Sequence, residues 1–354
     1  MRIRTVLAGT AAATAGFAAA GVGTIGALLV RAIVAAEAAV DDGPDALIAP
    51  PAQTPTTRTV HTADGTALHV EHHGPAIDDS DADILVAVHG WTCNTTYWNP
   101  QINHFAADRP VVVYDQRGHG RSELGRARPT MDMLGTDLDA VLSAVIPDGR
   151  KAILVGHSMG GITIMSWAAQ YPEKVTDTVS SVLLASTAAR QVMREHTLIP
   201  PLPRHAAPLL PTVTRVFTST PAPLPRSVYS AQLTRYMSLG ENARRAHVDF
   251  FDEMVASCPP RARARWGAAM HRLDVRAGLE ALRVPTTVLA GAADRLTPAA
   301  HAEQIATVLR DTGYLHELLI LDGVGHMSTV EAAARVSAAI EDLIEARVPA
   351  AAGN

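Results

Sequence analysis

The fold of this chain is decided by the stretch Ile153–Ile162, ILVGHSMGGI, in which an apolar run ends in a Gly-His-Ser-Met-Gly sequence. An amphipathic segment up to Tyr171 follows at once, so the pattern predicts a strand, a sharp turn and a helix, with Ser158 at the apex. A serine in a strained turn leaves no room for neighbouring β-carbons, and Gly156 and Gly160 supply that room. A bare Gly-x-Ser-x-Gly also arises by chance. The strand before it and the helix after it favour a catalytic serine.

Apolar runs of the same kind recur along the chain and predict further strands. Continuous apolar strands are typical of sheets covered by helices on both faces, and their alternation with helical patterns predicts a doubly wound sheet. Asp64-Gly65 lies between two shorter segments and predicts the turn of a hairpin. We therefore expect an α/β fold with a mostly parallel sheet of about eight strands flanked by helices. The other largely apolar runs lie at 84–88, 111–114, 179–185, 286–291 and 315–321.

The alternation of strand and helix stops after residue 185 and resumes near residue 279. Prolines are frequent in between, and only short helical patterns occur, notably Val228–Leu239 and Asn242–Ala256. An insertion of this size predicts a helical lid, or cap, placed after the sixth strand over the C-terminal edge of the sheet. The expected organisation is a core of residues 58–185 and 279–346, a cap of residues 186–278 and a tail of residues 347–354.

The N-terminal 40 residues differ from the rest of the chain. Arg2 and Arg4 precede an uncharged run rich in Ala and Gly, from Thr5 to Val30. A signal peptide has an apolar region of about 7–15 residues and a spanning helix needs about 20, so the run is long enough to span. Residues 1–40 are expected to be a membrane anchor or a signal segment, and residues 41–57 a proline-rich linker. The positive-inside bias then places the catalytic domain on the outer side of the cytoplasmic membrane.

The composition excludes several classes of function. The chain has 354 residues and a net charge of -5, whereas a nucleic-acid binder would present a basic face. Two cysteines cannot form a disulfide framework or a four-ligand zinc site, although a single bridge between Cys93 and Cys258 stays open. Three nearby histidines, at 69, 72 and 73, alternate on a strand without a cysteine or an acidic cluster, so a surface strand is the better interpretation. No metal or cofactor is expected.

A serine hydroxyl is a poor nucleophile by itself, so Ser158 needs a base and a third group that orients the base. Asp294 and His326 each follow a predicted strand, and the chain order Ser, Asp, His is the one expected for this architecture. The carboxyl ends of parallel strands meet at one edge of a sheet, so we expect these three residues to lie together. Asp322 and Asp115 also end strands, but they are interpreted as turn and structural residues.

Three other residues near these motifs are interpreted as non-catalytic. His119 and His157 are each preceded by a glycine and are expected to pack or to form hydrogen bonds. Cys93 follows the predicted turn at Trp91 and is expected to line the pocket, because the serine already occupies the apex of the strand-to-helix turn.

These motifs resemble those of the α/β-hydrolase superfamily over about Arg58 to Ala346. The resemblance implies that Ser158 is the nucleophile, His326 the general base and acid, and Asp294 the orienting carboxylate. The backbone N–H groups of Met159 and Trp91 would form the oxyanion hole, where two fixed donors contribute a few kcal/mol each. Five motifs carry the resemblance: HGW at 89–91, DQRGHGRS at 115–122, GHSMG at 156–160, GAAD at 291–294 and GH at 325–326.

The identity of the residue at the apex of the strand-to-helix turn narrows the choice among possible reactions. Epoxide hydrolases and haloalkane dehalogenases of this fold carry an aspartate there, whereas Ser158 indicates acyl transfer. The chain lacks the Gly-Gly-Ser-Trp-Gly of proline iminopeptidases, and His157 stands where cofactor-free haloperoxidases tend to have Phe. The sequence is most similar to monoacylglycerol lipases and broad carboxylesterases. We therefore expect a serine hydrolase that cleaves carboxylic esters of small molecules or lipids through an acyl-enzyme.

Two other classes of function stay open. A cofactor-free haloperoxidase or perhydrolase, or a C–C bond hydrolase, would use the same triad. A non-catalytic binding protein of this fold usually lacks one triad member, and this chain has all three. The sequence does not indicate the acyl chain, the alcohol, the oligomeric state or whether the N-terminal segment is cleaved.

Overall fold

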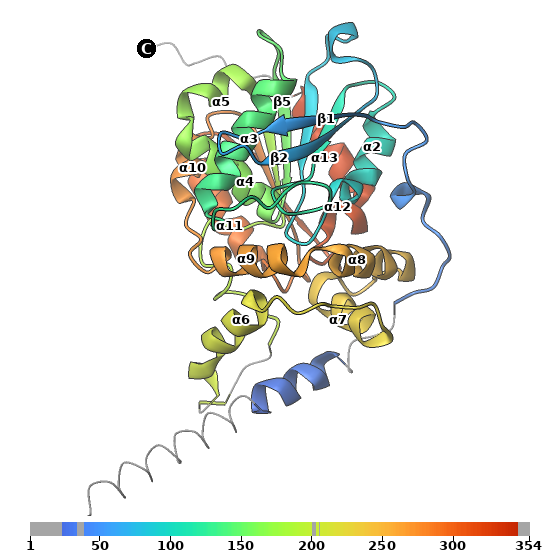
Figure 1. The fold of residues 1–354 in the computed structure, drawn as a ribbon, viewed down its shortest axis with the longest axis vertical. Helices are drawn as coiled ribbons and strands as arrows, with labels where there is room; N and C mark the ends of the chain where they lie inside the picture. Colours follow the sequence, from blue (N-terminus) through green and yellow to red (C-terminus); the bar gives the residue numbers. More distant parts are fainter. Residues whose placement is uncertain (1–22, 34–38, 200–202, 205, 346–354) are drawn as a thin grey trace, which may run out of the picture.

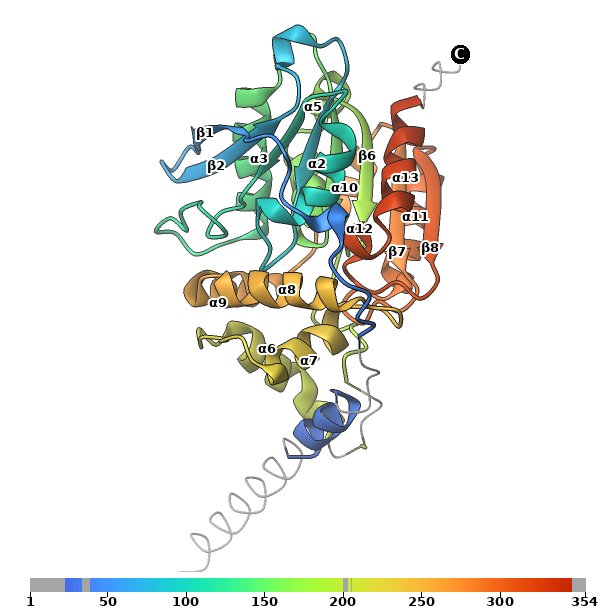
Figure 2. The same cartoon turned by 90° about the vertical axis from the view of Figure 1, so that its right-hand side faces the viewer.

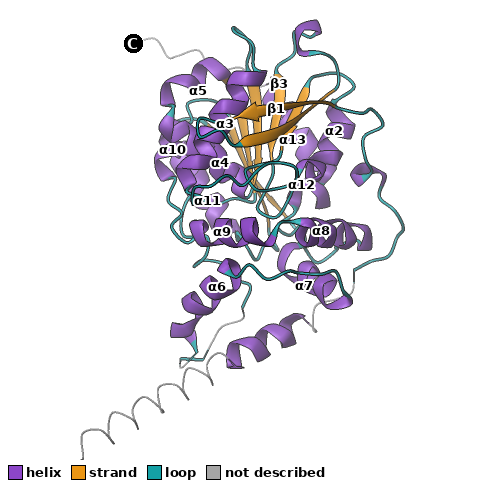
Figure 3. Ribbon diagram, in the orientation of Figure 1, coloured by secondary structure: helices purple, strands orange, loops and turns teal. Residues whose placement is uncertain are grey.

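A computed structural model describes residues 23–33, 39–199, 203–204 and 206–345 of the chain. A β-sheet lies at its centre between layers of helices (Figures 1 and 3). It has eight strands in the order β1-β2-β4-β3-β5-β6-β7-β8. β1 and β2 are antiparallel, β2 runs antiparallel to β4, and all other neighbours are parallel. This confirms the expected fold class. The strands are β1 Thr56–His61, β2 Ala67–His73, β3 Ile84–Val88, β4 Val111–Tyr114, β5 Ala152–His157, β6 Val179–Ala185, β7 Thr286–Gly291 and β8 Leu315–Leu321.

Helices cover both faces of the sheet, which is why the central strands are apolar throughout. In β3, Val86 belongs to one core cluster and its neighbours Leu85 and Ala87 to the other. The first cluster lies under α3 Met131–Val145, α4 Met159–Gln170, α10 Arg276–Ala281 and α11 Ala299–Asp311, with α5 Pro172–Thr178 beside α4. The second lies under α2 Asn99–Phe105, α12 Ser328–Glu331 and α13 Ala333–Glu345.

The insertion after β6 forms the expected cap. Four of its helices, α6 to α9, lie across the C-terminal end of the sheet (Figure 2). The last helix, α10, returns to the core, where a Cβ on Gly278 would stand 1.9 Å from the Met165 carbonyl oxygen of α4. The core therefore resumes slightly before residue 279. The cap helices are α6 Leu210–Ser219, α7 Val228–Ser238, α8 Arg245–Ser257 and α9 Pro260–Met270.

The first part of the segment expected to be a proline-rich linker is bound along the domain. Val40 exchanges two backbone hydrogen bonds with the start of α8, of 2.9 Å to the Ala243 carbonyl oxygen and 2.8 Å from the Arg245 N–H. Asn99 and Asn103 of α2 donate to the backbone carbonyl oxygens of residues 47–49 at 2.9–3.1 Å. We call residues 39–50 the strap. Ordered packing thus begins well before Arg58.

Two ion pairs add to the attachment of the strap. Arg244, just before α8, pairs with Asp42 at 2.8 Å and with Asp45. The buried His247 ring lies 2.9 Å from the same Asp45 carboxylate. The strap therefore contacts the cap at one end and the core helix α2 at the other.

The predicted membrane segment lies largely outside the described residues, which omit 1–22 and 34–38. Residues 23–33 form a helix beside the cap, where Gln232 of α7 donates to the Ile33 carbonyl oxygen at 3.0 Å (Figure 1). Within the described ranges, no helix has both the length and the apolarity needed to cross a membrane.

The hairpin β1–β2 turns at Asp64-Gly65 as expected, but its histidines do not all lie at the surface. β2 lies between β1 and β4, and the His73 side chain on it is buried. The buried Glu71 carboxylate lies 2.9 Å from the His69 ring and 3.3 Å from the His73 ring. The surface interpretation is therefore wrong for His73, because the face of β2 that carries Glu71 and His73 is covered. No set of His, Cys, Asp and Glu side chains in the described residues is placed to bind a metal ion.

Candidate active site

Ser158 lies in a strained turn between β5 and α4. Its φ is 52° and its ψ is −115°, a region that L-residues rarely adopt. The Ser158 N–H donates to the Ala185 carbonyl oxygen of β6 at 2.9 Å, which holds the turn against the sheet. A Cβ on Gly160 would lie 1.9 Å from the Val88 carbonyl oxygen, and one on Gly156 would lie 2.7 Å from the Gly160 backbone. Glycine is therefore required at both positions.

Asp294 and His326 form a buried pair at the ends of β7 and β8. The His326 Nδ1 lies 2.9 Å from the Asp294 Oδ2. Asp294 also accepts the Leu296 and Thr297 N–H groups at 2.8 and 2.9 Å, and the Thr297 hydroxyl at 2.7 Å. With these donors in place, the carboxylate has a fixed orientation and directs the His326 ring. A proton on Nδ1 is then shared with Asp294, and Nε2 is left free to accept one.

The His326 ring also lies beside the turn that carries the serine. The rings of His157 and His326 are 4.9 Å apart between centroids, and the His157 Nε2 donates to the His326 carbonyl oxygen at 2.9 Å. Burial holds the pKa of His157 well below its usual range, so this residue stays neutral. Within the described residues the Ser158 hydroxyl makes no hydrogen bond to His326. Such bonds are often long before substrate binds.

Two backbone N–H groups converge near Ser158. Met159 is the first residue of α4, and Trp91 follows β3 in a tight turn. Within the described residues neither backbone N–H donates a hydrogen bond. Gly90 brings this turn to the serine, since a Cβ there would stand 3.2 Å from the Ser158 Cβ. The arrangement leaves two donors available for an oxyanion.

His89 fixes the turn that carries Trp91. Its Nε2 accepts the Gln116 N–H at 3.0 Å, so its Nδ1 carries the proton and donates to the Gly90 carbonyl oxygen at 2.7 Å. Burial lowers the pKa of His89 to about 3, which keeps the ring neutral. The cap rests on the same turn, where the Trp91 indole donates to the Arg263 carbonyl oxygen at 3.1 Å.

The residues weighed as alternatives to the predicted catalytic residues lie at structural positions. The buried Asp115 accepts the Thr95 and Arg121 N–H groups at 2.8 Å each, and Asp322 is exposed. His119 is buried, and its Nδ1 lies 3.2 Å from the Arg117 carbonyl oxygen. These are the roles that the sequence indicated.

The two cysteines are buried and unpaired, so the open question of a bridge is answered for this structure. Burial raises the pKa of Cys93 far above its ordinary value and that of Cys258 to about 12. A thiol that does not ionise is a weak nucleophile. Neither cysteine is therefore placed to replace the serine.

Sequence reasoning missed two residues beside the triad. Thr297 donates hydrogen bonds to Asp294 from its N–H and from its hydroxyl. The Thr297 hydroxyl oxygen also lies 3.1 Å from the His326 Nδ1. Its place three residues after an aspartate is typical of a side-chain-capped turn and offered a signal. Glu331 accepts hydrogen bonds from Gly240 and Gly325, the residue before His326. No local pattern indicates this contact, because Gly240 is 91 residues away.

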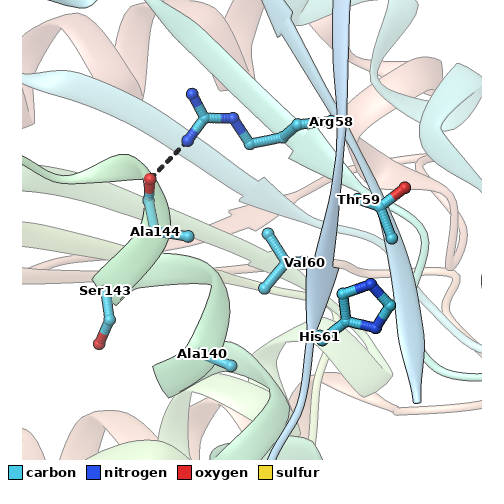
Figure 4. A pocket seen from close by; sticks show the side chains of 7 residues that line it. All are labelled: Arg58, Thr59, Val60, His61, Ala140, Ser143 and Ala144. Atoms are coloured by element: carbon cyan, nitrogen blue, oxygen red, sulfur yellow. Dashed lines mark hydrogen bonds between the residues drawn. The ribbon is translucent and has the colours of Figure 1, made fainter. Parts of the chain in front are cut away.

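A separate hollow of about 590 Å³ lies on the surface between β1 and α3 (Figure 4). The Arg58 guanidinium crosses it and donates to the Ala144 carbonyl oxygen at 2.6 Å. None of the residues predicted for the site lines it. It lies at the far end of the sheet from β7 and β8, and the candidate site does not include it.

Comparisons with known proteins point to hydrolases. A 3-oxoadipate enol-lactonase from Acinetobacter baylyi is 29% identical over 297 residues, which cover 80% of this chain and 95% of that protein. A pimeloyl-acyl-carrier-protein methyl ester esterase from Aromatoleum aromaticum is 28% identical over 267 residues, 73% of this chain and 97% of that protein. A solved structure of a membrane phospholipase A, a bacterial virulence factor, has a TM-score of 0.62 at 18% identity and covers 97% of both chains.

The family model for serine aminopeptidase, S33, matches residues 79–333. This region contains the turn of Ser158, the Asp294–His326 pair and the whole cap. The chain therefore belongs to the serine aminopeptidase S33 family of the α/β-hydrolase superfamily.

Proposed function

We propose that the protein is a serine hydrolase that cleaves carboxylic esters, with Ser158 as nucleophile, His326 as base and Asp294 as orienting carboxylate. The observation that carries the proposal is the buried His326–Asp294 pair, 2.9 Å apart, beside a serine in a strained turn. The relatives named as a lactonase and as a methyl ester esterase support ester chemistry. A peptidase reaction has no such support in this chain beyond the family description.

The proposed reaction has two halves. The Ser158 Oγ attacks the ester carbonyl carbon while its proton moves to the His326 Nε2, and the Met159 and Trp91 N–H groups bind the oxyanion. Collapse of the tetrahedral intermediate breaks the C–O bond, and the leaving alkoxide takes the proton from His326. Water then attacks the acyl-enzyme with the same base, and the acid and the free serine are released.

The proposed substrate is a lipid ester met at a membrane. Four of the exposed large apolar side chains in the described residues lie on the cap, and two of them, Val228 and Tyr229, are 84% and 87% exposed. α6 and α7 form the side of the cap that is turned away from the sheet, next to the helix of residues 23–33 (Figures 1 and 2). The likeness to a membrane phospholipase A, which covers 97% of the chain, also supports this choice.

The proposed location follows from the residue pattern of the N-terminal segment. The N-terminal segment holds the chain at the cytoplasmic membrane, with the catalytic domain on the outer side. The uncharged run from Thr5 to Val30 after Arg2 and Arg4 supports this location.

The experiment that tests the function is hydrolysis of p-nitrophenyl esters of increasing acyl length by the full-length protein, beside labelling of Ser158 with a serine-directed phosphonate. We expect labelling and turnover, with a preference for long acyl chains. A preference for acetate would indicate a confined carboxylesterase pocket. Absence of both turnover and labelling would refute the proposal and favour a binding protein. Peroxide-dependent oxidation supported by an organic acid would favour a perhydrolase.

The membrane contact of the cap gives a further prediction. The double variant Phe217→Ser/Tyr229→Ser should hydrolyse a long-chain ester embedded in phospholipid vesicles about tenfold more slowly, because two aromatic side chains no longer enter the lipid. Hydrolysis of soluble p-nitrophenyl acetate should not change. Ile320→Ser, which alters an exposed apolar residue on β8, is the matched control and should affect neither rate. Equal losses on both substrates would contradict a membrane role for the cap.

A further inference from the structure

The loop that carries His326 is fastened to the cap rather than standing alone above the sheet. The N–H groups of His326 and Met327 donate to the carbonyl oxygen of Ser238, the last residue of α7, at 2.9 and 3.2 Å. In the opposite direction, the Glu241 N–H of the cap donates to the Gly323 carbonyl oxygen at 3.0 Å. We call this contact between residues 238–241 and 323–327 the cap–loop junction.

Two glycines let the backbones meet at this junction. A Cβ on Gly240 would lie 2.0 Å from the Gly323 carbonyl oxygen, and a Cβ on Gly325 would lie 2.4 Å from the Gly240 nitrogen. These distances leave no room for a side chain on either of the two chain segments that meet at the junction. The position of the His326 loop is therefore set by the position of the end of α7.

Glu331 joins both sides of the junction with one carboxylate. Its Oε2 accepts the Gly240 N–H at 2.6 Å and its Oε1 accepts the Gly325 N–H at 3.1 Å. One bond thus goes to the cap and the other to the residue just before His326. Glu331 is the last residue of α12, which follows His326 directly, so the carboxylate closes a short ring of contacts around the histidine.

Burial, two hydrogen bonds and two neighbouring charges act on the ionisation of Glu331. Burial, with a smaller contribution from the nearby Asp294 carboxylate, raises the pKa of Glu331 to about 7. The two backbone N–H groups and Arg235 of α7 act in the opposite direction and stabilise the ionised form. Tyr97 also faces Glu331, and its hydroxyl stays protonated because burial raises its pKa well above the ordinary value.

We propose that Glu331 is a positioning residue for His326, which holds the histidine loop against the end of α7 and so fixes the place of the imidazole relative to Ser158. The inference rests on the proposed role of His326 as the general base. A proton acceptor displaced by about 1 Å can lose about 10²-fold in rate, so a junction of this kind is able to control turnover. An ionised carboxylate serves two N–H donors at once, whereas an amide offers one oxygen and places an NH₂ group against the other donor.

The test compares Glu331→Gln with Asp322→Asn, which removes the same charge from an exposed position of the same loop. At pH 8 we expect kcat of Glu331→Gln for p-nitrophenyl butyrate to fall about ten- to a hundredfold, with KM changed by less than about twofold. Asp322→Asn should match the wild type. The kcat ratio of wild type to Glu331→Gln should shrink toward pH 6, where wild-type Glu331 is itself protonated.

Thermal unfolding separates positioning from general destabilisation. Because the folded state raises the pKa of Glu331 from 4.5 to about 7, the contribution of this group to stability is complete below about pH 4.5 and is lost as the pH rises from there through about 7. Glutamine has no charge to bury, so the Tm of Glu331→Gln should decline less than that of the wild type between about pH 5 and pH 7. A purely structural role would instead lower Tm and kcat together at every pH.

Gly240→Ala tests the same junction from the cap side. It should lower kcat as well, and the double variant Gly240→Ala/Glu331→Gln should lose less than the product of the single losses. Ser158-dependent turnover that is unchanged by Glu331→Gln overturns this inference alone. Absence of Ser158-dependent turnover in the wild type overturns the proposed function and this inference together.

Discussion

Alanine in place of Ser158 is expected to lower kcat for ester hydrolysis by roughly 10⁵-fold or more. The Ser158 Oγ is the atom that forms the acyl-enzyme in the proposed reaction, and no other nucleophile in the site can take its place. The cysteine nearest the oxyanion turn, Cys93, is buried and its pKa is raised far above the ordinary value, so it stays a thiol. The residual rate would come from the oxyanion donors and from substrate binding.

The fold should tolerate this change. The backbone strain of a φ of 52° at position 158 is about the same for alanine as for serine. The Ser158 hydroxyl makes no hydrogen bond within the described residues. The free energy of unfolding is therefore expected to change by less than about 0.5 kcal/mol. Steady-state kinetics and thermal unfolding of the purified variant check both parts. Turnover close to the wild-type rate in a folded Ser158→Ala protein would rule out the serine mechanism.

Asparagine in place of Asp294 is expected to lower kcat by roughly 10³–10⁴-fold, the second largest effect. An amide can still accept the Leu296 and Thr297 N–H groups with its oxygen, so the turn should survive. Its NH₂ group then faces the His326 Nδ1, which lies 2.9 Å from the replaced oxygen. Nδ1 is forced to accept, the proton moves to Nε2, and the ring can no longer take a proton from Ser158.

Asp322→Asn is the matched control for this substitution. Asp322 is the other aspartate close to His326 in sequence, and it is exposed at the end of β8. Its kcat should stay within about twofold of the wild type, because no contact with the histidine is lost. A large loss for Asp322→Asn with a small one for Asp294→Asn would exchange the two roles. The comparison needs only initial rates on one ester and the unfolding curves of both variants.

The core fold could be predicted because its signals are local. Continuous apolar runs such as 84–88 correspond to strands buried on both faces, and the turn of Ser158 needs glycines that stand within two residues of it. Asp294 and His326 were predicted together although 32 residues separate them, because topology sends the ends of parallel strands to one edge. These predictions need only short sequence patterns and the general rule that the carboxyl ends of parallel strands lie at one edge of a sheet.

The features that escaped prediction depend on partners that are distant in the sequence. Residues 41–50 look like a linker by their prolines, but Asn99 and Arg244, which bind them, lie 51 and 202 residues further along. His73 appeared to lie on a surface strand because the sequence does not show which face of β2 the rest of the fold covers. Glu331 likewise meets Gly240 through the fold alone.

The strap gives the N-terminal segment a mechanical connection to the cap. Tension applied to the chain ahead of residue 39 reaches the two backbone bonds of Val40 and the Arg244–Asp42 pair before it reaches any strand of the sheet. The bonds of Asn99 and Asn103 to the strap come next along the path of the force. A pull from that end would therefore first detach the strap from the cap and then from α2, before any load reaches the strands of the sheet.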